Sequence, residues 1–183
     1  MFESIRESRK IVFMIGAGIS VASGLPTFTG PNAVSAEWLE DNELTLLNAF
    51  PNEAHKSIYD ISTKFNVAVI TQNVDGLHEK AGSEPICLHK HADGSFIKFG
   101  ESVDQEILEQ AVKSVLGPCV YICIGTRHLV FPAVTITDTA IASGNLFIDI
   151  NMKEEHMHPE TDIKLQGPAE KILPLLRDEL FKE

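Results

Sequence analysis

The sequence lacks a long apolar run and an apolar leader. Its 183 residues hold no window near the roughly 20 uninterrupted apolar residues that a membrane span needs. Charged residues interrupt the amino-terminal MFESIRESRKIVF, where a signal peptide would need an apolar core. We therefore expect a cytoplasmic protein without a membrane partner.

Basic residues and cysteines are also few. The chain has 15 Lys and Arg against 26 Asp and Glu, a net charge of −11, which repels phosphate backbones and anionic lipid headgroups. Nucleic acid is therefore not an expected partner. The three cysteines, Cys87, Cys119 and Cys123, are odd in number and form no CxxC pair. Neither a disulfide framework nor a four-cysteine zinc site can be built from this chain alone.

What is present fits one domain of the α/β class. A chain of 20.1 kDa with 44% hydrophobic and 22% charged residues is typical of a single globular unit. Apolar β-type runs occur at 10–16, 67–71, 85–88, 120–124 and 146–150. Helix-like stretches occur at 2–9, 33–50, from Pro51 through 61, 103–116, 132–142 and 168–180. Uniformly apolar strands alternating with amphipathic helices predict a doubly wound parallel sheet covered on both faces.

A glycine turn follows the first predicted strand. Gly16-Ala17-Gly18 precedes a predicted helix that Ser20 or Ser23 could cap, and this is where backbone N–H groups receive a pyrophosphate. The full dinucleotide fingerprint would need a third glycine where this chain has Val21. A nucleotide site and a plain tight turn therefore stay open as alternatives.

A dense polar cluster follows the strand at 67–71. Thr71-Gln72-Asn73-Val74-Asp75-Gly76 places four hydrogen-bonding side chains at the carboxyl edge of the predicted sheet, where α/β proteins bind ligands. The alternative is a capped loop in which Asn73 or Asp75 begins the helix near Leu77. The density of the cluster favours a ligand site.

Three other strand ends carry polar residues or glycine. Gly125-Thr126-Arg127 and Asn151 follow the strands at 120–124 and 146–150, and together with the two segments above they suggest one shared crevice. After the run at 85–88 the potential metal ligands alternate as Cys87, His89, His91 and Asp93. These would share one face only if the strand continued, so no metal is predicted.

The motifs taken together resemble the sirtuins, a family of NAD-dependent protein deacylases. The segments, in order, are GAGIS..SGLP.F.G, TQNVDGLHEKAG, LH, FGES and IGT…V.PA, followed by a strand ending in Asn, from about Lys10 to Leu175. The resemblance implies a Rossmann-like sheet, NAD as cofactor and an acylated lysine peptide or protein as substrate. His55 and His78 also match family positions, and His55 is expected to be structural.

The resemblance also implies roles for individual residues. His89 matches the catalytic base, with Asn73 and Asp75 as the other catalytic residues. The implied cofactor-binding residues are Gly16, Ala17, Gly18, Ile19, Phe28, Gln72, Asn73, Asp75, Gly125, Thr126, Arg127 and Asn151. The implied substrate-binding residues are Phe99, Gly100, Glu101, Val130 and Phe131. Breaking the nicotinamide bond develops an oxocarbenium-like ribose, which needs a held leaving group, a nucleophile and a base with a pKa near neutrality.

The departures from the family pattern concern a module and two charges. The zinc module of two CxxC pairs is missing between His89 and Phe99, so the small domain is expected to be absent or much reduced, and the lid segment at about 28–52 is short. The family's Asp and Arg after Pro26 are replaced by threonines. We hypothesise that Arg127 replaces the lost charge by pairing with the cofactor phosphates. The alternatives to a deacylase are an NAD glycohydrolase and a non-catalytic protein that binds NAD or ADP-ribose.

Overall fold

A computed structural model gives the fold of the chain. It describes residues 1–8, 10–28, 33–35, 37–91, 95, 97 and 101–182, without the side chains of residues 37 and 40. Among these residues, no helix combines the length and the apolar character that crossing a bilayer requires.

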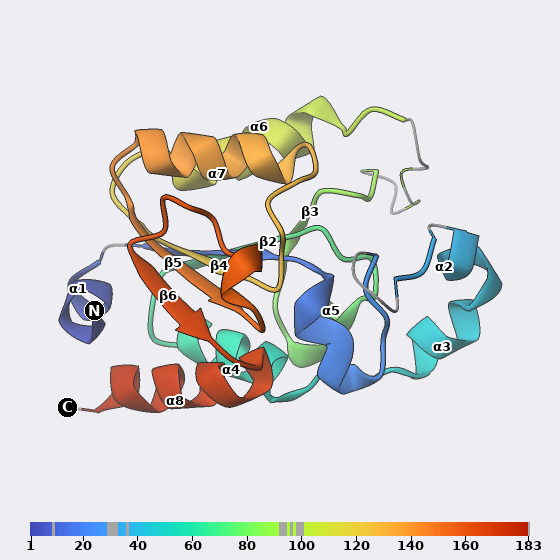
Figure 1. Ribbon diagram of the computed structural model, residues 1–183, viewed down its shortest axis with the longest axis horizontal. Coiled ribbons are helices and arrows are strands. Elements are labelled where there is room, and N and C mark those ends of the chain that lie inside the picture. Colours follow the sequence, from blue (N-terminus) through green and yellow to red (C-terminus); the bar gives the residue numbers. More distant parts are fainter. Residues whose placement is uncertain are drawn as a thin grey trace.

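The described residues form one parallel sheet (Figure 1). Its strands are β1 (Ile11–Ile15), β2 (Val67–Thr71), β3 (Ile86–Cys87), β4 (Val120–Ile124), β5 (Leu146–Asn151) and β6 (Ile163–Gln166). They lie in the order β3-β2-β1-β4-β5-β6, and every neighbouring pair is parallel. The direction of winding reverses between β1 and β4, the point where such sheets bind ligands beyond the carboxyl ends of their strands. The predicted doubly wound, Rossmann-like α/β sheet is confirmed.

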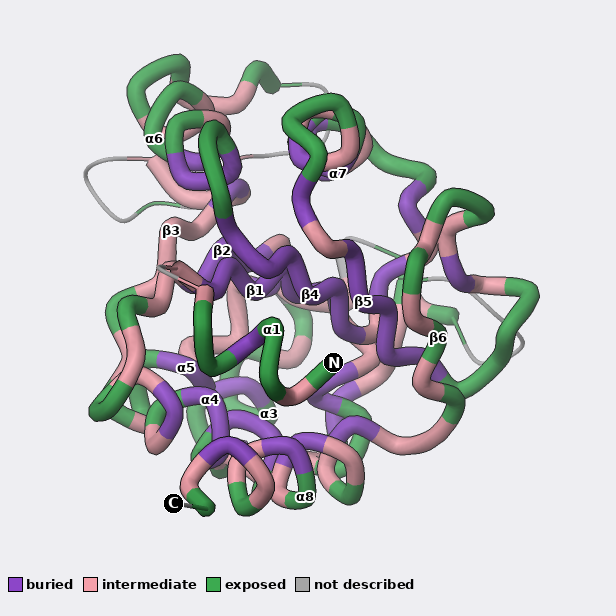
Figure 2. The backbone as a smooth tube through the Cα atoms, turned by 90° about the vertical axis from the view of Figure 1, so that its left-hand side faces the viewer, coloured by how far each residue is buried: buried purple, intermediate pink, exposed green. Residues whose placement is uncertain are grey.

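Helices cover both faces of the sheet. One face carries α1 (Phe2–Glu7), α4 (Glu53–Ser62) and α8 (Ala169–Phe181), and the other carries α6 (Gln105–Val115) and α7 (Ala133–Ala142) (Figures 1 and 2). Figure 2 shows the buried central strands between these two layers. All residues of β1 and β4 are buried because apolar side chains are covered from both sides. Each face therefore has its own apolar core.

The segment at 33–50 differs from the single helix that its leucine spacing predicts. It forms two short helices, α2 (Glu37–Asp41) and α3 (Glu43–Asn48), at the end of the molecule beyond the carboxyl ends of the strands (Figure 1). Leu46 joins a small separate core with Leu25, Ala49 and Leu77, against which Trp38 and Leu39 pack. Leu44 and Leu47 are 73% and 62% exposed, so the predicted apolar face is only partly buried.

Two further predictions need correction. Pro51 is not the first residue of a helix, because α4 begins at Glu53 and the Asn52 side chain caps it by accepting a hydrogen bond from Ala54 N at 2.9 Å. The strand β6 was not predicted. Its residues alternate between half-buried and exposed positions, so the segment lacks the continuous apolar run that marked the other strands.

Candidate functional site at the carboxyl ends of the strands

The four central strands end in one row. Ile15 is in register with Thr71 on one side and with Ile124 on the other, and Ile124 is in register with Ile150. The next residues along these strands are Gln72, Gly16, Gly125 and Asn151, which therefore form the following row across the sheet. The four strand ends that were expected to form one crevice therefore lie next to one another.

Thr126 connects several parts of this row. Its hydroxyl accepts a hydrogen bond from Gln72 Nε2 at 3.2 Å, and its carbonyl oxygen accepts one from Asn151 Nδ2 at 2.7 Å. Asn151 and Thr126 are buried. Residues from β2, β4 and β5 that lie far apart in sequence are thus held together where the strands end.

The glycines of the first turn are required by a backbone contact. A Cβ atom on Gly16 would lie 2.6 Å from the carbonyl oxygen of Gly125, and one on Gly18 would lie 2.7 Å from the Gly125 Cα atom. Gly125 itself has φ +61°, a left-handed conformation that favours glycine. The close approach of the turns after β1 and β4 thus accounts for all three glycines. The tight turn is confirmed, and pyrophosphate binding there remains a prediction.

The turn after β1 leads into a 3-10 helix, η1 (Ala17–Ser23), rather than an α-helix. Neither Ser20 nor Ser23 caps it, so that prediction is wrong. Ser23 Oγ instead accepts a hydrogen bond from Asn52 Nδ2 at 3.0 Å, which ties the helix to α4. Ser20 lies inside the predicted site.

Ser20, Asn73 and Asp75 form a hydrogen-bonded network between η1 and the segment after β2. Ser20 Oγ donates to Asp75 Oδ2 at 2.6 Å, while Asn73 Nδ2 donates to Ser20 Oγ and to the carbonyl of Gly16, both at 3.3 Å. Asp75 Oδ1 also accepts from Leu77 N at 3.0 Å at the start of α5 (Leu77–Ala81). Asp75 is not the N-cap of α5, because Gly76 occupies that position and no side chain caps the helix, but one Asp75 oxygen binds the first residue of α5 while the other joins the network. Ser20 belongs to this network, whereas the sequence alone suggested only a helix cap for it.

A cleft opens over this network. Its lining includes the polar residues Ser20, Asn73 and Asp75 and the aromatic residues Phe28 and Trp38. The remaining lining residues are Ala17, Leu25, Pro26, Leu39, Leu46 and Val74. A mostly apolar wall with a few fixed polar groups is the usual composition of a small-molecule site.

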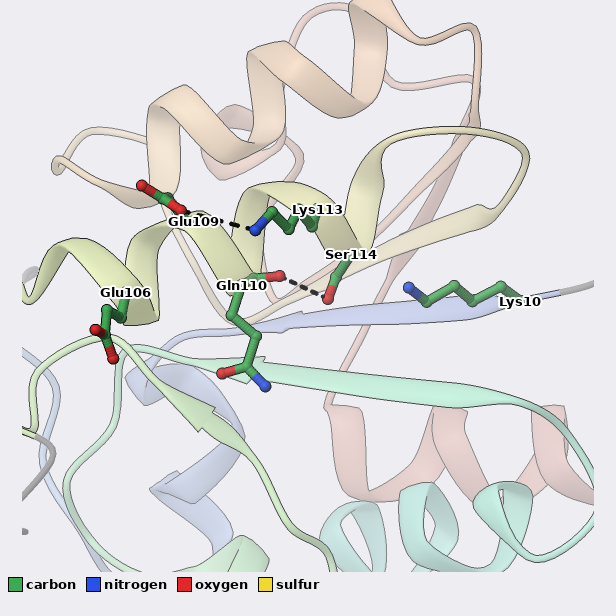
Figure 3. A pocket seen from close by; sticks show the side chains of 6 residues that line it. All are labelled: Lys10, Glu106, Glu109, Gln110, Lys113 and Ser114. Carbon is green, nitrogen blue, oxygen red and sulfur yellow. Dashed lines mark hydrogen bonds and ion pairs between the residues drawn. The ribbon is translucent and has the colours of Figure 1, made fainter.

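A second hollow lies along α6, beside the start of β1 (Figure 3). It is lined by Lys10, Glu106, Glu109, Gln110, Lys113 and Ser114, none of which belongs to the predicted site. The lysines and glutamates project from the surface of one helix and one strand end (Figure 3). We assign this hollow no role.

His89 follows the edge strand β3. Leu88 N donates to Thr71 O at 2.9 Å, and the Cys87 thiol donates to Asn73 O at 3.2 Å, so the chain that leads into His89 runs along the end of β2. The ring of His89 is partly buried, and burial lowers its pKa, which leaves the imidazole neutral at pH 7. A neutral imidazole can accept a proton.

The alternating set of Cys87, His89, His91 and Asp93 does not share one strand face. Strand β3 ends at Cys87 and a turn follows, so the condition for that cluster is not met. Asp93 lies outside the described residues. Among the residues that are described, no three His, Cys, Asp or Glu side chains are grouped as metal ligands.

His55 and His78 form a buried pair behind the network. Their ring centroids are 4.8 Å apart, their side chains are almost fully buried, and none of their four ring nitrogens has a hydrogen-bond partner in the described part of the chain. Burial lowers the pKa of each ring to about 4. His55 is therefore a neutral packing residue at pH 7, as expected, and His78 is its partner.

The chain is similar in sequence and in fold to several known proteins. A sequence model of the Sir2 family matches residues 32–99. An NAD-dependent protein deacylase of Pseudomonas putida is 28% identical and the alignment covers 95% of this chain and 91% of that protein. The NAD-dependent protein deacylase 1 of Archaeoglobus fulgidus is also 28% identical, with 100% and 96% covered. A solved mutant Sir2 homologue in complex with ADP-ribose superposes with a TM-score of 0.83 at 25% identity, covering 98% of this chain and 94% of that chain. In sequence and in fold, this chain is therefore similar to members of the Sir2 family.

A second solved structure extends the comparison. A Sir2 homologue in complex with NAD superposes on this chain with a TM-score of 0.81 at 26% identity, covering 98% of this chain and 92% of the other. The alignment with the Pseudomonas protein spans 241 positions, 58 more than the 183 residues here. That relative therefore has at least 58 residues without a counterpart in this chain.

The remaining predicted residues, so far as the structure describes them, do not line the cleft. Arg127 is partly buried, and its Nε atom is buried without a hydrogen-bond partner among the described residues. Val130 and Phe131 are 53% and 58% exposed. Glu101 is exposed, and its carboxylate lies 3.6 Å from the ring of His91. The predicted substrate residues Phe99 and Gly100 lie outside the described residues.

Proposed function

We propose that this chain is an NAD-dependent protein lysine deacylase, which transfers the acyl group of a modified lysine to ADP-ribose and releases nicotinamide. The observation that carries the proposal is the network of Ser20, Asn73 and Asp75, which lines a cleft beside the carboxyl ends of β1 and β2. The deacylase names of its relatives from Pseudomonas putida and Archaeoglobus fulgidus support it.

The chemistry of the site fits NAD. The cleft combines apolar contacts from Phe28 and its neighbours with fixed amide and carboxylate groups, which suits a ring that carries a carboxamide. The unpartnered Nε of Arg127 suits an anionic phosphate. We assign the pyrophosphate to the turns at Gly16–Gly18 and Gly125–Arg127, and the adenosine ribose to Asn151.

The other cofactor contacts follow from the network. We assign Ile19, Phe28, Asn73 and Asp75 to the nicotinamide side, and Gln72 to the nearby ribose. Ser20 holds Asp75 through its 2.6 Å hydrogen bond, which fixes the Asp75 side chain beside Asn73. Fixed polar groups lose little freedom on binding, so they stabilise a bound state more than mobile groups do.

His89 is the proposed general base. NAD supplies the sugar carbon that accepts the acyl oxygen, with nicotinamide as the leaving group. The buried imidazole is neutral at pH 7 and accepts a proton from a ribose hydroxyl, because burial lowers its pKa below that of an exposed histidine. Asn73 and Asp75 orient the group that leaves.

The proposed peptide site is formed by exposed residues. Exposed Val130 and Phe131 present apolar surface beside the turn after β4, and Glu101 offers a charge. An acylated peptide in extended form would bind there, with Phe99 and Gly100 as its other predicted contacts.

We also propose that this protein works without a structural zinc module. Cys119 and Cys123 are buried within and beside β4, while Cys87 is at the end of β3, so the three thiols lie in the sheet rather than in a separate cluster. Addition of a strong chelator should leave the thermal unfolding midpoint unchanged. A drop in the midpoint on chelation would contradict this.

One assay tests the enzymatic proposal. Nicotinamide release from NAD should require an acetyl-lysine peptide, and His89→Ala should lower kcat by about a hundredfold or more, because a general base contributes about that factor. Release without peptide would instead show an NAD glycohydrolase. NAD binding without release in either condition would show a non-catalytic binder.

The role of Arg127 is tested by calorimetry. Arg127→Ala should weaken NAD binding about tenfold, since a charge-assisted hydrogen bond to phosphate is lost. Arg127→Lys is the matched control, because it keeps the charge and should recover part of the affinity. Unchanged affinity in Arg127→Ala would remove this assignment.

A further inference from the structure

A buried hydrogen bond between His128 and Asp149 joins the loop after β4 to the strand β5. His128 Nε2 lies 2.7 Å from Asp149 Oδ2, and the two side chains are 4% and 0% exposed. Asp149 points to the same face of β5 as Phe147, whose ring lies 5.9 Å from that of His128. A buried carboxylate needs a partner, because an unpaired charge in the interior is strongly unfavourable.

The backbone of His128 also requires something to hold it. Among the described residues it is the one non-glycine residue with positive φ, at +55°. Such a conformation persists at a residue with a side chain when the surrounding structure fixes it. The bond from the His128 ring to Asp149 is one of the contacts that hold this residue, beside the bond from its N–H to Thr126 Oγ1.

This loop is the one that carries the proposed phosphate contacts. We define the β4 loop as residues 125–131. His128 N donates to Thr126 Oγ1 at 3.3 Å, and the same hydroxyl accepts from Gln72. Thr126 is therefore tied to β2 and, through its carbonyl and Asn151, to β5. His128 is the anchor on the far side of Arg127, so Arg127 lies between two fixed residues.

Asp149 also holds the segment after β5. His158 N donates to Asp149 Oδ2 at 3.0 Å, and the His158 ring lies 5.4 Å from the ring of His128. One carboxylate oxygen thus fixes the β4 loop and the residues that follow Asn151. Asp149 Oδ1 is buried and has no hydrogen-bond partner among the described residues, so Oδ2 makes all of the side-chain contacts observed there.

We propose that His128 and Asp149 are positioning residues that preset the β4 loop for cofactor binding. The inference rests on the proposed function, because it concerns the same NAD site. The pair does not touch the reacting atoms. It keeps the Thr126 and Arg127 backbone in the binding conformation, and so it raises the fraction of molecules that are competent to bind.

The test compares loop variants with a matched core variant. His128→Gly allows the left-handed backbone and removes the anchor, and Asp149→Asn keeps the shape of the side chain and removes its charge. Tyr121→Phe is the control, because it deletes another buried hydrogen bond between β4 and α7, that of Tyr121 OH with Thr137 Oγ1 at 2.9 Å, without touching the loop.

We expect the loop variants to bind NAD more weakly while their turnover at saturating NAD stays nearly unchanged. The Kd and KM for NAD should rise about tenfold in His128→Gly, as when one molecule in ten is competent, and by a smaller factor in Asp149→Asn. At saturating NAD, kcat should stay within about twofold of the original, and Tyr121→Phe should leave Kd unchanged. The proposal would be overturned if the Kd for NAD were the same in all of the proteins. It would also be overturned if the Kd of Tyr121→Phe rose in proportion to the stability which that variant loses.

A second measurement does not depend on NAD activity. In the ligand-free protein, amide hydrogen exchange in a peptide covering the β4 loop should be faster in His128→Gly than in the original, and unchanged in Tyr121→Phe. Unchanged exchange in His128→Gly would overturn the proposal. If the original protein bound no NAD although His128→Gly still sped amide exchange in the β4 loop, that outcome would contradict the proposed function. It would leave the anchoring of the loop by His128 supported.

Discussion

Two buried histidine sites lie on opposite faces of the same sheet, and they differ in what their rings contact. His55 and His78 pack against each other with no hydrogen-bond partner for any ring nitrogen in the described part of the chain. His128, in contrast, is bound to the carboxylate of Asp149. The rings of the first pair pack as neutral groups, whereas the second pair links the β4 loop to strand β5. The same buried side chain thus serves packing alone in one place and a hydrogen-bonded connection in the other.

The largest expected effect is the response of the first pair to acid. Above pH 6.5 both rings are neutral in the folded and the unfolded chain, so stability is full. Because burial lowers the pKa of each ring to about 4, the unfolded chain takes up protons that the folded chain does not as the pH falls from 6.5 to about 4. Stability is lost in that window, by about 3 kcal/mol for each ring.

Urea unfolding at a series of pH values from 7.5 to 4 measures this loss. The double variant His55→Leu, His78→Leu should show a shallower decline than the original protein. Parallel curves for the two proteins would mean that other groups account for the acid sensitivity.

The next effect concerns the second pair. Asp149→Ala leaves His128 and His158 N without their shared acceptor in the interior, and the free energy of unfolding at pH 7 should fall by about 4 kcal/mol. Chemical denaturation measures it. A loss below about 1 kcal/mol would show that the pair is dispensable for folding.

The smallest effect is expected where no polar contact is lost. His78→Leu replaces one unpartnered ring with apolar volume, so the free energy of unfolding at pH 7 should change by less than about 1.5 kcal/mol. The same substitution at His128 leaves the buried Asp149 side chain with His158 N as its remaining hydrogen-bond partner among the described residues and should be far more destabilising. Similar losses in the two variants, compared by urea unfolding, would remove the distinction between the sites.

The sequence predicted what depends on local pattern. The runs at 67–71 and 120–124 were recognised because strands buried on both faces are continuously apolar. The strand β6 was missed because only Ile163 and Leu165 are apolar in it, and a half-exposed edge strand of four residues resembles a loop. The two short helices in place of one at 33–50 depend on which leucines find a partner, and spacing alone does not determine that.

The site was predicted in part for the same reason. Asn73 and Asp75 were identified because a dense polar cluster at a strand end is unusual in a loop. Ser20 was missed because its role depends on a hydrogen bond to a residue 55 positions away. His128 and Asp149 carried no signal either, since the bond between them exists only once β4 and β5 are paired.

The two borders of the sheet limit self-association. β3 has two residues and β6 has four. On β6, the Nζ atom of the exposed Lys164 lies 3.3 Å from Glu154 Oε1. Short borders that carry a charge are poor templates for a strand from another molecule. Because the sheet is continuously apolar inside, these blunt borders are what protects a concentrated solution of the protein from edge-to-edge aggregation.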